Sequence, residues 1–215
     1  MAVNAKQIWI VGCGPGSEEY VTPAARRAVR EADVLLDSAR LLALFPERAC
    51  EKIVSPTDSD RVLALLAELV EKGRRAAVLV SGDPGLFSLA QVITGRFGAG
   101  ACEVVSAVSS VQVAFARLGL SWAGARILSA HGRAPAVPSA DLAAADKIAI
   151  LAGTAEALQW SAAAAKALGE THAAFVCENL TPPQERVVRI EAGQVASCGA
   201  SPLAVVLLVR RTLLA

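Results

Sequence analysis

Short apolar runs, each the length of a β-strand, recur along the 215-residue chain with helical segments between them. In chain order they are QIWIV, DVLLD, AAVLVS, CEVVS, RILSA, KIAILA, AAFVCEN, RVVRI and PLAVVLLVRR. Several are continuously apolar, which is typical of strands covered on both faces. Strands that alternate with helices in this way predict an α/β fold.

The alternation divides the chain into two predicted α/β domains, residues 1–118 and residues 119–215. Regular alternation through the first part predicts a parallel sheet. The second part ends in two closely spaced runs, RVVRI and PLAVVLLVRR, which predict an antiparallel pair.

Capping residues and helical patterns predict three helices. Thr22 and Pro23 are a natural N-cap and first-turn pair. A helix from Asp58 to Lys72 has one apolar face, and another is predicted over Thr154 to Leu168. His172, which begins a strand-like run, is expected at the surface.

Charge and cysteine content exclude several classes of protein. The 21 Lys and Arg residues balance 20 Asp and Glu residues, so no basic patch for nucleic acid is expected. The 5 cysteines are widely spaced without a CxxC pair, which favours reduced thiols over disulfides or zinc. No cleavable signal is present, and no run reaches the ~18 apolar residues of a membrane span. A cytoplasmic protein with a small-molecule ligand, neither membrane-bound nor metal-binding, is therefore expected.

The loop from Gly12 to Gly16, GCGPG, follows the first apolar run. A dinucleotide-binding turn needs a helix that starts directly at its glycines and an acid after the second strand, the place taken here by Asp37. The helix at Thr22 starts several residues too late for that role. The glycines instead predict an open turn that a flat ligand can approach, although a simple tight turn explains them equally well.

Four more loops follow strand-like runs and carry polar residues: Ser81–Gly85, Ala107–Ser110, Ser129–Arg133 and Glu178–Pro183. Ligands of open α/β sheets gather at the carboxyl ends of strands, where such loops meet. The loops therefore predict a binding site.

In this order the loops resemble those of the tetrapyrrole (corrin and porphyrin) methyltransferases, which use S-adenosylmethionine. The segments that carry the resemblance are VGCGPGSEEYVTPAA, LVSGDPGLFSLA, SAVSSVQVAFARLGL, SAHGR and ENLTPPQER, and together they span most of the chain. Cys13, Tyr20 and Ala107 depart from the family's usual residues in small ways. SAHGR and ENLTPPQER are similar to the branch that methylates C5 of precorrins in cobalamin biosynthesis.

The resemblance implies two α/β domains with S-adenosylmethionine in the cleft between them, a precorrin substrate and a homodimer. Since the chain stops soon after its last strand-like run, the resemblance also implies that a separate protein carries out methylation and decarboxylation at C15. The cofactor-binding residues that it implies are Pro15, Gly82, Asp83, Leu86, Ser109, Ser110, Ala152, Asn179, Leu180 and Pro202.

Three of these positions have an alternative structural role. Asp83 precedes a proline, where an aspartate often holds a turn by bonding backbone amides. Ser109 and Ser110 begin a helix and are suited to capping it, although a helix N-terminus also attracts a carboxylate.

A precorrin carries many carboxylates, so arginines in loops are candidates to bind it. The candidates are Arg40, Arg133 and Arg186, each of which can bind a carboxylate through two hydrogen bonds. For Arg40, the position of an ordinary solvated surface arginine is favoured. His131, with Arg133 in SAHGR, is the candidate catalytic group for acid–base chemistry or substrate binding, although a structural role explains a lone histidine equally well.

Methyl transfer from a sulfonium is an in-line displacement that mainly requires the two reactants to be held in place. The chain lacks the usual nucleophile motifs, which agrees with that chemistry. Three alternatives remain open: methylation at another macrocycle carbon, a nucleotide-dependent oxidoreductase that uses Gly12, Gly14 and Asp37, and a binding subunit without catalysis.

Overall fold

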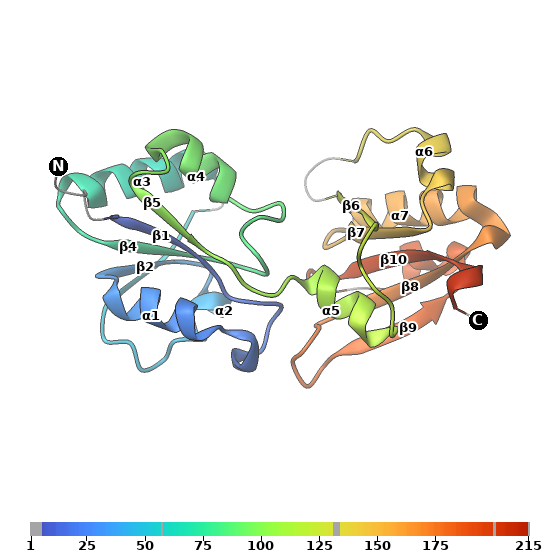
Figure 1. Cartoon of the computed structure of the whole chain (residues 1–215), viewed down its shortest axis with the longest axis horizontal. Coiled ribbons are helices and arrows are strands. Elements are labelled where there is room, and N and C mark those ends of the chain that lie inside the picture. Colours follow the sequence, from blue (N-terminus) through green and yellow to red (C-terminus); the bar gives the residue numbers. More distant parts are fainter. Residues whose placement is uncertain (1–5, 57, 131–133, 200, 215) are drawn as a thin grey trace. The chain divides into compact units, whose positions relative to one another are not determined.

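The computed structural model describes residues 6–56, 58–130, 134–199 and 201–214. They form two compact units, Met1–Ser109 and Ser110–Ala215, each with its own five-stranded sheet (Figure 1). The predicted α/β fold is confirmed. The units divide before helix α5 (Ser110–Arg117), whereas the prediction placed the boundary after it, because α5 packs against strand β10 (Val205–Arg210) of the second unit.

The sheet of the first unit is entirely parallel, with the order β3-β2-β4-β1-β5. Its strands are β1 (Ile8–Gly12), β2 (Val34–Asp37), β3 (Glu51–Val54), β4 (Ala76–Val80) and β5 (Cys102–Val105). The prediction of a parallel sheet is correct. All five carboxyl ends therefore meet at one edge of the sheet, where the loops that follow these strands lie.

Helices cover both faces of this sheet (Figure 1). Buried residues of α1 (Pro23–Glu31) and α2 (Ala39–Leu42) share one core with Trp9, Val11 and Leu35 of the strands. On the other face, α3 (Ser59–Glu71) and α4 (Ala90–Phe97) share a second core with Ile8 and Ile10. Successive side chains of a strand point to opposite faces, so the continuous apolar runs fill both cores.

The three predicted helix starts are confirmed by N-cap hydrogen bonds. The Thr22 hydroxyl accepts from the Ala25 amide at 3.1 Å, and the Asp58 carboxylate accepts from the Asp60 amide at 2.9 Å. In the second unit, Thr154 caps α7 (Ala155–Leu168) in the same way as Thr22 caps α1. Each cap satisfies an amide that has no partner within its helix.

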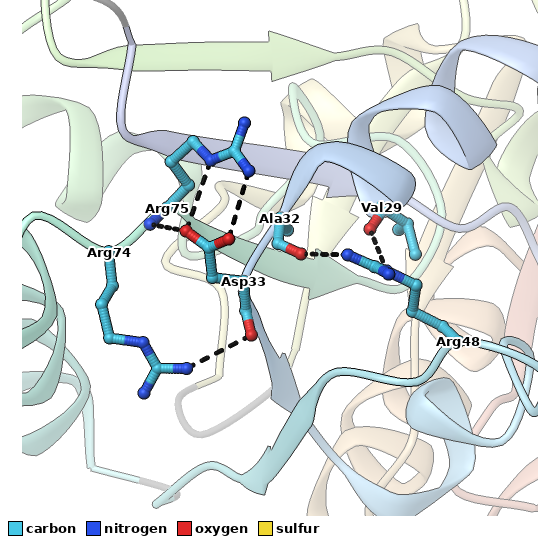
Figure 2. Close-up of polar contacts among 6 residues, drawn as sticks. All are labelled: Val29, Ala32, Asp33, Arg48, Arg74 and Arg75. Carbon is cyan, nitrogen blue, oxygen red and sulfur yellow. Dashed lines mark hydrogen bonds and ion pairs between the residues drawn. The ribbon is translucent and has the colours of Figure 1, made fainter.

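Arginines hold the end of α1 and the start of the strands beside it (Figure 2). The Arg48 guanidinium donates to the carbonyl oxygens of Val29 and Ala32, at 3.2 and 2.6 Å, which caps the last turn of α1. The Asp33 carboxylate accepts from the backbone amide of Arg75 at 2.9 Å and from its guanidinium at 3.1 and 3.3 Å. These bonds lower the pKa of Asp33.

The sheet of the second unit is mixed, with the order β6-β7-β10-β8-β9. Its other strands are β6 (Arg126–Ser129), β7 (Lys147–Leu151), β8 (His172–Glu178) and β9 (Arg186–Ile190). The predicted pairing of the last two strands with each other is wrong. Strand β10 lies between β7 and β8 and is antiparallel to both, whereas β9 pairs with β8 at the edge.

Helices α6 (Ser139–Ala144) and α7 share one core with β7, β8 and β10. Short 3-10 turns complete the two units: Glu18–Tyr20, Gly169–Thr171, Ala192–Ser197 and Arg211–Leu213. The surface position expected for His172 is wrong, because this side chain is only 5% exposed and its Nε2 lies 2.9 Å from the Ala145 carbonyl oxygen. Within the described ranges, no helix has the length and apolar content needed to cross a membrane.

Candidate active site

The loops after β1 and β4 are joined by their glycines. The Gly82 amide donates to the Gly14 carbonyl at 2.8 Å, and the Gly14 amide donates back at 3.4 Å. Both residues have a positive φ, +76° for Gly14 and +68° for Gly82, a region that glycine enters without steric cost. The GCGPG loop is therefore a tight turn paired with a second loop, and α1 begins well beyond it.

Gly12 lies where a third loop closes on this pair. A Cβ atom at Gly12 would lie 2.6 Å from the Ala107 Cβ, 2.7 Å from the Pro84 Cδ and 2.9 Å from the Gly82 carbonyl oxygen. No side chain fits at such distances without movement of the backbone. The loops after β1, β4 and β5 thus pack together at the carboxyl edge of the first sheet.

Asp83 ties two of these loops together through its carboxylate. Oδ1 accepts from the Gly85 amide at 2.8 Å, and Oδ2 accepts from the Ala107 amide at 2.9 Å. Of the two roles considered for Asp83, the structural one is therefore present. Each carboxylate oxygen has a second lone pair, so the same group retains capacity to accept from a ligand.

The structure brings together the predicted cofactor residues of the first unit. Gly82, Asp83 and Leu86 share the loop after β4, and Pro15 lies in the loop that pairs with it. Pro15 and Gly82 are buried, whereas Asp83 and Leu86 are partly exposed.

Ser109 and Ser110 lie where the chain passes from β5 into α5. Ser109 is buried and occupies the position before α5, and Ser110 is the first residue of that helix. This position fits the predicted cap.

The predicted cofactor residues of the second unit gather at one end of its sheet. Ala152 follows β7, and Asn179 and Leu180 follow β8. Pro202 lies in the turn that leads into β10, whose Val205 pairs with both Leu151 and Cys177. The Ala152 amide donates to the Ala204 carbonyl at 2.9 Å, which joins two of these loops directly.

The loop after β8 has an unusual backbone. Asn179 and Thr181 both have positive φ, +45° and +84°, and Leu180 between them is buried. Non-glycine residues enter this region at an energetic cost. The Asn179 Oδ1 accepts from the Ser201 hydroxyl at 3.0 Å, which links the loop to the turn before β10.

Two glutamates hold the same loop. Glu178 is 4% exposed, and its carboxylate accepts from the Ser201 amide and from Arg186, both at 2.5 Å. Glu185 accepts from the Thr181 amide at 2.6 Å and pairs with Arg117 of α5. Neither glutamate was predicted as a site residue, although both lie within the quoted ENLTPPQER segment. Arg186, which was predicted to bind substrate carboxylates, forms an ion pair with Glu178 of the same chain.

The candidate catalytic residues His131 and Arg133 lie outside the described residues. Strand β6, which precedes them, runs parallel to β7, so its carboxyl end lies at the same end of the sheet as that of β7. Arg40 is exposed, and its Nη2 donates to the Ser81 hydroxyl at 3.3 Å. This arginine therefore reaches the loop that carries Gly82 and Asp83.

Asp37 is the last residue of β2 and lies near Arg40. Desolvation by burial raises the pKa of its carboxyl group, and the Ser38 amide and the nearby Arg40 partly offset that rise. A carboxylate with a raised pKa is a better proton acceptor than an ordinary aspartate. Sequence reasoning weighed Asp37 only as a ribose-binding acid, because burial at a strand end is not visible in a sequence.

The thiols of this region are not suited to nucleophilic chemistry. Burial raises the pKa of Cys13 to about 12, and burial also raises that of Cys177 to about 12. A buried neutral thiol is inert, since the thiolate is the reactive form. Among the described residues, no group of three or more His, Cys, Asp or Glu side chains is arranged to hold a metal ion.

Comparison with known proteins gives a matching family and named relatives. Residues 7–196 match the family of tetrapyrrole (corrin/porphyrin) methylases. The chain is 31% identical over 179 residues to the cobalt-precorrin-7 C(5)-methyltransferase of Salmonella typhimurium, covering 83% of this chain and 87% of that protein. It is 36% identical over 132 residues to the probable cobalt-precorrin-7 C(5)-methyltransferase of Methanocaldococcus jannaschii, covering 59% of this chain and 61% of that protein.

Solved structures agree with this fold. A uroporphyrin-III C-methyl transferase from Thermus thermophilus, complexed with S-adenyl homocysteine, is 25% identical with a TM-score of 0.73, and the match covers 94% of this chain and 97% of that one. A precorrin-6Y methylase from Archaeoglobus fulgidus is 24% identical with a TM-score of 0.72, and the match covers 95% of this chain and 98% of that one. With a family match over most of its length, the chain belongs to the tetrapyrrole (corrin/porphyrin) methylases.

Proposed function

We propose that this protein transfers the methyl group of S-adenosylmethionine to C5 of precorrin-7, or of its cobalt form, in cobalamin biosynthesis. The observation that carries the proposal is the 31% identity to a cobalt-precorrin-7 C(5)-methyltransferase over 83% of the chain. The loops at the carboxyl ends of β1, β4 and β8 support it, because they offer backbone and carboxylate groups without a nucleophile.

S-adenosylmethionine supplies an activated methyl group, so the chain's own task is to hold donor and acceptor in line. We propose that the cofactor is bound by Pro15, Gly82, Asp83, Leu86, Ser109, Ser110, Ala152, Asn179, Leu180 and Pro202. Glycines allow the backbone to approach the adenosine, and serine hydroxyls can bond the ribose or the carboxylate. The Asp83 carboxylate offsets positive charge on the donor.

The acceptor carries acetate and propionate groups, which need cations. Arg40 suits this role because it is exposed and lies 3.3 Å from the Ser81 hydroxyl, next to the proposed cofactor loop. Arg186 is less suited, since Glu178 already engages it. His131 and Arg133 remain proposed as catalytic or substrate-binding groups.

Methylation of a ring carbon leaves positive charge on the macrocycle until a proton is lost. Asp37 is our candidate acceptor for that proton, because its pKa is raised by burial and it ends a strand beside Cys13 and Arg40.

Each of the three other functions considered has a specific test. Methylation at another macrocycle carbon keeps the same cofactor site, and product analysis by NMR distinguishes it. An oxidoreductase is disfavoured because α1 begins at Pro23, too far from Gly14 to place its N-terminus on a diphosphate there. The protein should accordingly bind S-adenosylhomocysteine and not NAD. A binding subunit without catalysis would bind both the cofactor product and the precorrin but form no methylated product.

The experiment that tests the proposal is calorimetric titration with S-adenosylhomocysteine, followed by an assay with precorrin-7 and S-adenosylmethionine. We expect micromolar binding and a product heavier by one methyl group, with the new carbon at C5. A folded protein that binds S-adenosylhomocysteine but leaves every precorrin unchanged would contradict the proposed catalysis.

We also infer a homodimer in the cytoplasm. Support for the compartment comes from Cys13, Cys50, Cys102, Cys177 and Cys198, all of which are free thiols. Support for the dimer comes from resemblance to the family, and light scattering on the purified protein tests it. Methylation at C15 lies outside the chemistry proposed for these two units.

A further inference from the structure

Phe87 is an exposed aromatic residue in the loop that carries the proposed cofactor residues. It follows Leu86 in the connection between β4 and α4, and 59% of it is exposed. Large aromatic side chains usually bury most of their surface in a folded protein. The position of Phe87 beside Leu86 therefore calls for an explanation.

The backbone of Phe87 is also strained. Its φ is +48°, in the left-handed region that a bulky residue rarely occupies. The other non-glycine residues with positive φ in the described ranges are Asn179 and Thr181, which belong to the loop after β8. Such strain persists only where the surrounding structure determines the conformation, and it often marks a functional loop.

Hydrogen bonds fix the loop on both sides of Phe87. Before it, the Leu86 amide donates to the Asp83 carbonyl at 3.1 Å. After it, the Ser88 hydroxyl donates to the Pro84 carbonyl at 2.5 Å and accepts from the Ala90 amide at 3.1 Å. These bonds fix the backbone on both sides of residue 87, whose side chain is exposed to solvent.

The edge of the sheet that carries this loop has both apolar and cationic groups. Arg40 contacts Ser81 at the start of the same loop, and Val54, at the carboxyl end of β3, is 64% exposed. Strands β3, β2 and β4 are parallel neighbours, so the residues that follow them lie along one edge of the sheet. A flat ring system with an apolar face and carboxylates on its rim complements such a surface.

We propose that Phe87 contacts the tetrapyrrole acceptor, with its ring against the apolar face of the macrocycle. This inference rests on the proposed function, and it names a substrate-contact residue for that reaction. The backbone conformation of Phe87 holds its ring at the surface, where the acceptor can contact it. Removing the ring then weakens acceptor binding and leaves cofactor binding unchanged.

The test compares the wild type with Phe87→Ala and Phe87→Gly in steady-state assays with precorrin-7 and S-adenosylmethionine. We expect the KM for precorrin-7 to rise about tenfold in both variants, the effect of losing much of one buried aromatic contact. The Kd for S-adenosylhomocysteine should stay within about twofold of the wild-type value. Phe87→Gly relieves the backbone strain and so provides a variant that folds even where Phe87→Ala is impaired.

Val92→Ala is the matched control, because Val92 is an exposed apolar residue, 43% exposed, that lies on α4 and outside the loop. It should leave both constants unchanged. An unchanged KM for precorrin-7 in the Phe87 variants of an active enzyme would overturn the inference and leave the proposed function intact. A wild type that binds S-adenosylhomocysteine and does not methylate precorrin-7 would overturn both.

Discussion

Arg117 and Glu185 form a two-bond ion pair in which Nε and Nη2 of the arginine donate to the two carboxylate oxygens, at 2.5 and 3.0 Å. The same carboxylate accepts from the backbone amide of Thr181 at 2.6 Å. Helix α5 is thereby tied to the loop after β8, at a residue whose φ is +84°. The pair connects a surface helix to the backbone of the proposed cofactor loop.

Arg117→Met should weaken S-adenosylhomocysteine binding about fivefold, because Glu185 loses the partner that orients it toward Thr181. The loss of folding stability should be small, about 1 kcal/mol, since the pair is partly exposed. Calorimetry and urea denaturation measure the two effects. Arg126→Met is the matched control, because it removes an arginine from the Arg126–Asp141 pair at the start of β6. Equal losses of affinity in both variants would contradict a role specific to Arg117.

Asp83→Ala should weaken S-adenosylhomocysteine binding at least tenfold and reduce the free energy of unfolding by about 2 kcal/mol. The variant removes the hydrogen bond from the Gly85 amide within the loop after β4 and the bond from the Ala107 amide in the loop after β5. Asp83→Asn retains an acceptor oxygen for one of the two amides, so it should fall between the wild type and the alanine variant. Wild-type affinity in a folded Asp83→Ala protein would remove this loop from the cofactor site.

Gly12→Ala should destabilise the protein by about 1–3 kcal/mol, because its methyl group would overlap Ala107, Pro84 and the Gly82 carbonyl. Gly95→Ala provides the control. Gly95 lies inside α4, and a Cβ atom there would meet nothing within 4 Å. Alanine is the better helix former, so this variant should be more stable by up to about 1 kcal/mol. Thermal unfolding of the two variants decides between these opposite expectations.

Asp37→Asn should raise stability at neutral pH and lower the turnover number by about 10²–10⁴. The raised pKa means that the folded state holds the proton more tightly than the unfolded state, so the ionised carboxylate opposes folding. The wild type should gain stability as the pH falls toward this pKa, and the difference from Asp37→Asn should shrink. Full activity in Asp37→Asn would exclude Asp37 as the proton acceptor.

The Asp33–Arg75 pair predicts the opposite pH dependence (Figure 2). The bonds from Arg75, first those of its side chain, hold the pKa of Asp33 below the ordinary value of an aspartate. Its contribution to stability is therefore complete above that value and is lost as the pH falls through the folded-state pKa. Asp33→Asn should be less stable than the wild type at pH 7, and the gap should close in acid. Urea denaturation of both proteins at several pH values measures this difference in the free energy of unfolding.

Most of the fold could be predicted from the sequence because the buried strands are continuously apolar. The caps expected at Thr22 and Asp58 also located helix starts correctly, and the start expected at Thr154 is correct as well. Strand β3 was missed because its residues, EKIV, are largely exposed at the sheet edge and carry charge. The pairing of β10 was predicted wrongly, since closeness in sequence does not reveal a strand inserted between β7 and β8.

The candidate site was predictable only in part. The quoted loops do end strands, and the structure groups the predicted residues within each unit. The roles of Glu178 and Glu185 were not predictable, because a glutamate in a loop looks like a solvated one until its backbone partners are known. Phe87 had no signal either, since positive φ and exposure depend on the folded loop. The roles of His131 and Arg133 stay predictions.

The position of β10 has a consequence for synthesis on the ribosome. It is the last strand of the described chain, yet it occupies the centre of the second sheet, between β7 and β8. Both strands pair with β10 on that side, so nascent chains that end before β10 leave these two strand edges without their native partner. The first unit, whose sheet is complete by Val105, can fold while the second is still being made. The sheet of the second unit can form completely only after β10 has been synthesised.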